Sequence, residues 1–287
     1  MADLGISLVL LAAIVFLCEA CRRTTAQLFG NKYGLYITEI ISTFQLCACT
    51  QELKLLGEAG QIEPYIGLTI TYVITVVHIT TFQGALCNPY GAFERVYRRE
   101  VTYASAVCLI ACQIIAAIAA QFLAPYIWTL GLSDLHVSHG RFGFKCFSPL
   151  GGTLIEAAAV ELACTFSVQA AVIHIHKVEE KLQVHAIAAI ITFLVYAGGS
   201  ISGAVFNPVL ALSIQFPCSG NTFLEYCFVY WLGPLLGMTS CILLFEKIVP
   251  FLSGKSTVGL EFPVAQKKNQ FFLNMNDEGQ VGQKASF

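Results

Sequence analysis

The stretch "GAVFNPVLAL", from Gly203 to Leu212, places an Asn-Pro pair inside one of the most apolar parts of the chain. Proline lacks a backbone N–H and stops a helix that would run through it, and in lipid each unsatisfied backbone group is costly. The same pair occurs again in "GALCNPYGAF", from Gly84 to Phe93. Asn is a good N-cap and Pro is favoured at the first helical position, so each pair predicts a helix start within apolar surroundings.

The composition around these motifs is that of a membrane protein. Apolar residues make up 56% of the 287 residues, 12% are charged, and the mean hydropathy is +0.69, whereas a soluble domain carries about 25% charged residues. The net charge of −2 argues against nucleic acid as a partner, and membrane lipid is expected instead. The 12 cysteines lie mostly in apolar runs without zinc-type spacing, so neither a metal nor another cofactor is expected.

Seven apolar segments are predicted as membrane spans, each of which needs ~20 predominantly apolar residues. They are roughly Leu4–Cys21, Tyr36–Leu56, Tyr65–Phe82, Val101–Tyr126, Thr153–His176, His185–Ala197 and Phe223–Pro250. Seven spans are also what a receptor would show, so this alternative has to be tested against the rest of the sequence.

The run from His185 to Phe216 contains no Lys, Arg, Asp or Glu and is too long for one span. Its middle, "AGGSISG", is poor helix. We therefore predict a span, a Gly-rich break and a second helix from Asn207 to Phe216, about 15 Å long. That is half of a ~30 Å hydrocarbon core. The first motif predicts an equivalent half-helix that starts at Asn88.

The two halves of the chain repeat the same order of features. "EIISTF" (Glu39–Phe44) matches "ELACTF" (Glu161–Phe166), and "GALCNP" matches "GAVFNP". Each repeat has three spans, an odd number, so the second repeat must start from the opposite side of the membrane. The result is an inverted pair with half-helices entering from both faces, a pattern for which a receptor has no use.

The basic residues support this topology. Most Lys and Arg fall on one side, which the positive-inside rule makes cytoplasmic. The first segment has no basic residue before it and is followed by Arg22 and Arg23, the reverse of a secretory signal peptide. We interpret it as a retained helix with Met1 on the non-cytoplasmic side; the alternative is a helix that lies along the membrane surface.

Two Asn-Pro half-helices in an inverted repeat, with a Glu in the first span of each half, resemble the aquaporins over about Tyr33 to Pro250. Three stretches resemble the unorthodox, or super-, aquaporins, vertebrate types eleven and twelve. They are "FQLCACTQELKLL" (Phe44–Leu56), "ITFLVYAGGSISGAVFNPVLAL" (Ile191–Leu212) and "VYWLGPLLG" (Val229–Gly237). These look most like the eleventh type, while "LCEACRR" (Leu17–Arg23) looks more like the twelfth. That group also has a Cys nine residues beyond its second motif, where Cys218 stands.

The resemblance implies an all-α membrane protein with six spans, two Asn-Pro half-helices and an additional amino-terminal hydrophobic helix. The expected divisions are that helix with its basic linker (1–32), the first repeat (33–126), a non-cytoplasmic connecting loop (127–152), the second repeat (153–250) and a polar cytoplasmic tail (251–287). It further implies a homotetramer in the endoplasmic reticulum or another intracellular membrane.

At the centre we expect the amino ends of the half-helices, Asn88-Pro89 and Asn207-Pro208, to meet and to present amide N–H groups and positive helix ends to the pore. Orthodox members have Ala after each pair, whereas this chain has Tyr90 and Val209, which we expect to pack where the half-helices touch.

The outer filter is expected to be apolar. Orthodox members place an Arg where this chain has Leu210, and water-selective members carry a His near the position of Val195. We therefore expect slower water flow and room for small uncharged solutes such as glycerol or hydrogen peroxide. His78, His174 and His185 lie at span ends or faces and are expected to be structural; the alternative is a pore-facing histidine, for which His78 is the best candidate of the three.

Resemblance gives Glu39 and Glu161 a supporting role, in which they accept N–H bonds from the loops before the half-helices; a proton relay is the alternative. Cys146 and Cys218 both map to the non-cytoplasmic side, where they form either a disulfide or two free thiols.

Three functions remain open from the sequence. The first is a passive channel for water and small neutral solutes. The second is a coupled transporter, since broken helices also build transporters. The third is a structural membrane protein with a vestigial pore that Tyr90 plugs. An enzyme is not expected, because no nucleophile–base pair or phosphate loop is found.

Overall fold

The computed structural model describes residues 2–58 and 62–253, apart from the side chains of residues 29–32. Within these residues every named element is helical, and the one β-type contact is an isolated bridge between Phe147 and Ser219. The predicted all-α class is therefore confirmed. Most of the predicted tail lies outside the described residues, from residue 254 onward.

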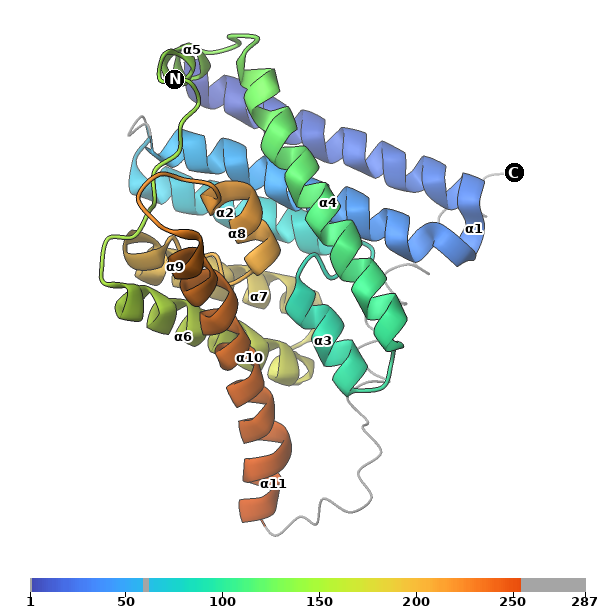
Figure 1. Ribbon diagram of the computed structural model, residues 1–287. Coiled ribbons are helices and arrows are strands. Elements are labelled where there is room, and N and C mark those ends of the chain that lie inside the picture. Colours follow the sequence, from blue (N-terminus) through green and yellow to red (C-terminus); the bar gives the residue numbers. More distant parts are fainter. Residues whose placement is uncertain (1, 59–61, 254–287) are drawn as a thin grey trace.

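The first helix, α1 (Ala2–Glu58), folds back on itself. Ser7 and Glu52 are 45 residues apart, which would separate them by about 68 Å along a straight helix. Instead, the Ser7 hydroxyl donates to Glu52 Oε1 at 2.6 Å. Residues 2–28, called here the amino-terminal arm, therefore run antiparallel to residues 33–58, the second arm, as Figure 1 shows in blue.

The first repeat continues from the second arm through three more helices. These are α2 (Pro64–Thr81), the short α3 (Pro89–Tyr97) and α4 (Tyr103–Trp128). A short helix that the sequence did not predict, α5 (Asp134–Arg141), follows in the connecting loop. It lies beside the start of the chain (Figure 1), where the Leu135 N–H donates to Asp3 Oδ1 at 3.4 Å.

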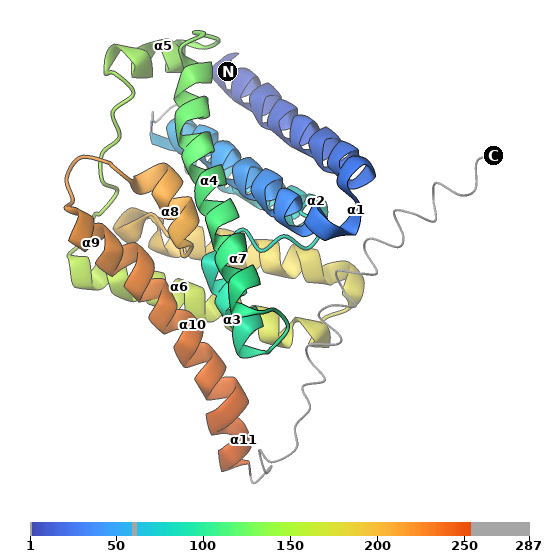
Figure 2. The same cartoon turned by 45° about the vertical axis from the view of Figure 1, so that its right-hand side comes forward.

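The second repeat has the same sequence of long and short helices. It contains α6 (Leu154–His174) with the 3-10 turn η1 (Ile175–Lys177), α7 (Glu180–Ser202) and the short α8 (Pro208–Gln215). The last long rod, orange in Figure 2, joins α9 (Phe223–Cys227), η2 (Phe228–Leu232), α10 (Gly233–Leu243), η3 (Leu244–Ile248) and α11 (Val249–Leu252), with η2 and η3 π-helical. The predicted half-helices are thus confirmed as α3 and α8.

Long helices pair in a way that follows the repeat. The second arm of α1 packs on α4, and α6 packs on α10 in the equivalent place, while α2 and α7 face each other between the repeats. Glycines allow the contact of α10 with α6. A Cβ atom at Gly237 would lie 2.3 Å from the carbonyl oxygen of Leu162, and one at Gly233 would lie 2.8 Å from that of Ala158.

Among the described residues, six helical stretches are long and apolar enough to cross a membrane. They are Ala2–Leu28, Pro64–Thr81, Tyr103–Trp128, Leu154–Lys177, Glu180–Ser202 and Phe223–Leu252. The predicted span Tyr36–Leu56, within the second arm, is not among them. This arm is the more polar one, because it contains Glu39, Gln45 and Glu52, all of which are buried.

Candidate functional site

Each Asn-Pro motif caps its own half-helix. Asn88 Oδ1 accepts the Tyr90 N–H at 3.1 Å, and Pro89 occupies the first turn of α3. Asn207 Oδ1 accepts the Val209 and Leu210 N–H groups at 3.1 and 3.3 Å, with Pro208 opening α8. Because proline has no N–H to satisfy, a helix can begin here in apolar surroundings at little cost.

The two motifs also contact each other. Asn207 Nδ2 donates to the carbonyl oxygen of Cys87 at 2.7 Å, and Asn88 Nδ2 donates to that of Phe206 at 3.4 Å. Each asparagine therefore caps its own helix with its side-chain oxygen. Its side-chain nitrogen donates to the segment that leads into the opposite half-helix, and these two segments, which end at Asn88 and Asn207, are called here the re-entrant segments. Cys87 is 120 residues from Asn207, so this reciprocal contact brings the amino ends of α3 and α8 together, with their positive dipole ends toward one point.

Two buried carboxylates hold the segments that lead to these motifs. Glu39 accepts the Leu86 and Cys87 N–H groups at 2.9 and 2.6 Å. Glu161 accepts the Val205 and Phe206 N–H groups at 2.9 and 2.5 Å. Both glutamates are fully buried. Each has one further donor, which is Gln113 Nε2 for Glu39 and the Ser202 hydroxyl for Glu161, both at 2.7 Å.

The carboxylates stabilise a strained backbone. Cys87 and Phe206, each directly before its Asn, have φ values of 53° and 38°, a region that costs a non-glycine residue about 1–3 kcal/mol. In this conformation two successive N–H groups point to one acceptor, which the glutamate supplies. The matched geometry in both repeats is what the supporting role of Glu39 and Glu161 requires.

Tyr90 and Val209 do not pack against each other. Tyr90 lies with Met238 and Ile242 in one hydrophobic cluster, and its hydroxyl donates to the carbonyl oxygen of Trp231 at the π-helical η2. Val209 is fully buried in another cluster, formed with Cys47, Ala48, Ala117 and Ala120. We expected Tyr90 and Val209 to pack where the half-helices touch; in the structure Tyr90 packs against α10, and Val209 packs against the second arm and α4.

The remaining predicted pore residues, Leu210, Val195 and His78, differ in burial and in location. Leu210 is partly buried and packs on the cluster around Val209, and Val195 is partly exposed on α7. His78, the best candidate for a pore-facing histidine, is only 6% exposed and stacks on Phe82 with ring centroids 4.9 Å apart. Its Nε2 has no hydrogen-bond partner among the described residues. It belongs to the end of α2 rather than to the Asn-Pro contact.

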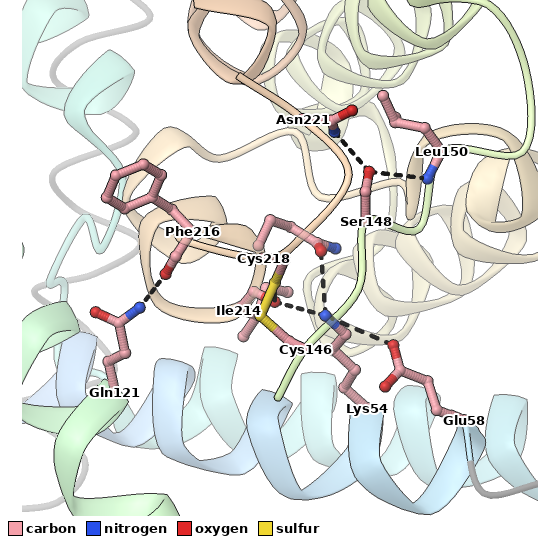
Figure 3. The surroundings of a disulfide bond; sticks show 11 residues. Lys54, Glu58, Gln121, Cys146, Ser148, Leu150, Ile214, Phe216, Cys218 and Asn221 are labelled. Carbon is pink, nitrogen blue, oxygen red and sulfur yellow. Dashed lines mark hydrogen bonds and ion pairs between the residues drawn. A yellow bond between two sulfur atoms is a disulfide. The ribbon is translucent and has the colours of Figure 1, made fainter. Parts of the chain in front are cut away.

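A disulfide joins Cys146 of the connecting loop to Cys218, just beyond α8 (Figure 3). Lys54 reaches the same place from α1. Its ammonium donates to the carbonyl oxygen of Ile214 at 2.6 Å and to Gln215 Oε1 at 3.1 Å. A cation at the carboxyl end of α8 is favoured by the helix dipole, so Lys54 and the disulfide anchor the same helix end.

Sequence reasoning missed several polar residues of this region. Lys54, Gln51 and Gln113 each donate to the half-helices or to Glu39. A signal was present, since Gln51 and Lys54 are three residues apart on one helix face. The partners of these residues lie in other helices and are not visible in the local sequence.

Two re-entrant half-helices that meet at Asn-Pro motifs, inside a repeated set of long apolar helices, define a class of membrane protein. The family model described as major intrinsic protein matches residues 65–245. Human aquaporin-11 is 36% identical over 257 residues, covering 89% of this chain and 94% of that protein. Mouse aquaporin-12 is 34% identical over 257 residues, covering 88% and 89%. The chain therefore belongs to the major intrinsic protein family, the aquaporins.

Proposed function

We propose that the protein is a passive channel for water and small neutral solutes, with glycerol and hydrogen peroxide among them. Membership of a channel family supports passage of water or a small solute. The observation that carries the proposal is the reciprocal contact of Asn88 and Asn207 with the opposite re-entrant segments.

The chemistry of this contact suits neutral solutes. A side-chain amide has two N–H donors, and the amino ends of α3 and α8 add about half a positive charge each. A solute oxygen is attracted by these donors, whereas a cation meets a positive field and loses its hydration shell. Leu210 and Val195 remove the polar groups of an orthodox outer filter, which favours slower water flow and admission of somewhat larger neutral solutes.

The two alternatives are less well supported. Coupled transport needs an ionisable group that is free to change partners near the midplane, but each of the two glutamates accepts three hydrogen bonds. A pore plugged by Tyr90 is disfavoured by the bond of its hydroxyl to Trp231, which directs the side chain toward η2 and α10.

We extend the proposal to a homotetramer in the endoplasmic reticulum or another intracellular membrane. The location is supported by the disulfide between Cys146 and Cys218, which suits an oxidising lumen on the predicted non-cytoplasmic side. The tetramer, with one pore in each subunit, rests on family resemblance.

The test is stopped-flow light scattering on vesicles that hold the purified protein, under sucrose and then glycerol gradients, with peroxide influx read by an internal dye. An Asn88→Asp/Asn207→Asp double variant is the control. We expect wild-type flux well above that of empty vesicles for at least one solute and loss of that flux in the variant. Wild-type vesicles indistinguishable from empty ones for every solute would refute the channel.

A further inference from the structure

Arg22 is buried within the protein although the sequence places it in a basic flank. Its side chain is fully shielded from solvent, while that of the adjacent Arg23 is 73% exposed. Both arginines pair with Glu19. A buried cation in a membrane helix is expensive to place and marks a functional position unless its partners explain it otherwise.

The guanidinium of Arg22 reaches from the amino-terminal arm to the second arm. Nη2 donates to Gln45 Oε1 at 2.8 Å, and Nη1 donates to the Ser42 hydroxyl at 3.4 Å. These partners lie on the same arm as Glu39, three and six residues further along. The planar fork of an arginine suits two acceptors of this kind, which a lysine would contact only as a point charge.

Both partners of Arg22 continue to the carboxyl end of α2. The Ser42 hydroxyl donates to the carbonyl oxygen of Phe82 at 3.5 Å, and Gln45 Nε2 donates to Thr81 Oγ1 at 3.2 Å. A polar chain therefore runs from Arg22 through the second arm to the last residues of α2. Each link has a donor and an acceptor, so the buried groups satisfy one another.

The end of α2 is where the first re-entrant segment begins. Directly after Phe82, Gln83 and Gly84 adopt φ values of 51° and 83°, and the segment then runs to Cys87 and Asn88. Glu39 fixes the far end of this segment, and the chain from Arg22 fixes its beginning.

We propose that Arg22 is a positioning residue for the first Asn-Pro motif, so that the additional amino-terminal helix is part of the channel's working structure. The proposal rests on the channel function proposed above. Arg22 acts through Ser42 and Gln45: it holds the end of α2 in place, and thereby sets where residues 83–88 enter the site.

The experiment measures amide hydrogen exchange of residues 82–88 in the full-length protein in lipid nanodiscs. Residues 202–207, the equivalent segment of the second repeat, serve as the internal reference. The variants are Arg22→Met, Arg22→Lys and Ser42→Ala. Arg23→Met is the matched control, because it removes a neighbouring arginine that is exposed and bonds the same Glu19.

We expect Arg22→Met to raise exchange in 82–88 about tenfold while 202–207 stays unchanged, since local opening is read segment by segment. Arg22→Lys should lie nearer to wild type, and Arg23→Met should match it. An unchanged 82–88 segment in Arg22→Met, an equal rise in 202–207, or an equal rise in Arg23→Met would overturn the proposal.

If Arg22→Met does not fold, the proposal is tested with Ser42→Ala, which removes only one hydroxyl group of the polar chain. A smaller rise confined to 82–88 supports the proposal, and no rise overturns it. Solute flux is then measured on the same variants and should fall as exchange in 82–88 rises. Amide hydrogen exchange is measured without a solute. A wild-type protein without solute flux would therefore refute the channel function, while exchange in residues 82–88 would still test the positioning role of Arg22.

Discussion

The half-helices α3 and α8 are alike at their amino ends and different at their carboxyl ends. Both begin at an Asn-Pro pair, and both re-entrant segments donate two N–H groups to a buried glutamate. At its far end α3 is tied to the last long helix by the ion pair between Arg98 and Glu246, whereas α8 is held by Lys54 and the disulfide at Cys218.

The amino ends of α3 and α8 form the site, whereas their carboxyl ends lie away from it. The amino ends share one function and therefore one geometry. The carboxyl ends only have to be anchored, and they are anchored differently. An ion pair holds the end of α3, whereas Lys54 and a disulfide hold the end of α8.

The largest effect is expected when the carboxylates that hold the two amino ends are replaced. Glu39→Gln and Glu161→Gln each replace an acceptor oxygen by an amide, leaving buried N–H groups without a partner at about 1–3 kcal/mol each. We expect both variants to lose several °C in thermal unfolding in detergent and to lose solute flux. The exposed Glu63→Gln is the control. If Glu39→Gln lowered the unfolding temperature and the solute flux while Glu161→Gln changed neither, the two repeats would not be equivalent.

The next largest effect concerns the disulfide. Cys218→Ser opens a loop of 72 residues, and the loop entropy for this length corresponds to about 4 kcal/mol. We expect a lower unfolding temperature for Cys218→Ser, and a fall of similar size when the wild type is reduced. Cys21→Ser, at an exposed free thiol, should behave as wild type. A reductant that lowers the unfolding temperature of Cys218→Ser as much as that of wild type would contradict this.

A third prediction adds charge at the second motif. Leu210→Arg restores the cation of an orthodox outer filter, one helical turn before the carbonyl oxygen that Lys54 binds. We expect glycerol flux to fall about tenfold, equivalent to ~1.4 kcal/mol, while water flux is retained. The measurement is the ratio of the two fluxes in stopped-flow. An unchanged ratio would mean that position 210 does not face the pathway.

The smallest effect is expected at Tyr90. Tyr90→Phe removes one hydrogen bond to Trp231, worth about 1 kcal/mol, and leaves the ring in its cluster with Met238 and Ile242. Stability should fall slightly and solute flux should not change. Phe93→Tyr, on the exposed side of the same helix, is the control. A large rise in solute flux for Tyr90→Phe would support the alternative that Tyr90 blocks the pore.

The parts that the sequence predicted are those with local or repeated signals. Asn88 and Asn207 cap helices through bonds to residues two or three positions on, so the Asn-Pro pairs alone predict both half-helices. Glu39 and Glu161 were found because a charge in an apolar run is costly and both occur at matching places. The long apolar runs predicted most of the long helices.

The parts that were missed depend on partners distant in the chain. Arg22 reads as a flank because basic residues usually end a span, and its burial follows only from the folding back of α1. Tyr90 was expected between the half-helices because the family's small residue lies there, but its hydroxyl found an acceptor at η2. His78 is buried at the end of α2, where its ring stacks on Phe82.

The most direct test of the central claim compares Asn88→Asp with Asn207→Asp as single variants. In proteoliposomes, solute flux and proton leak are measured together, with Asn221→Asp as the control for the same change outside the site. If the two asparagines form one reciprocal contact, both variants lose solute flux and gain proton leak to a similar extent, and Asn221→Asp matches wild type. Loss in one variant with normal flux in the other would contradict the account.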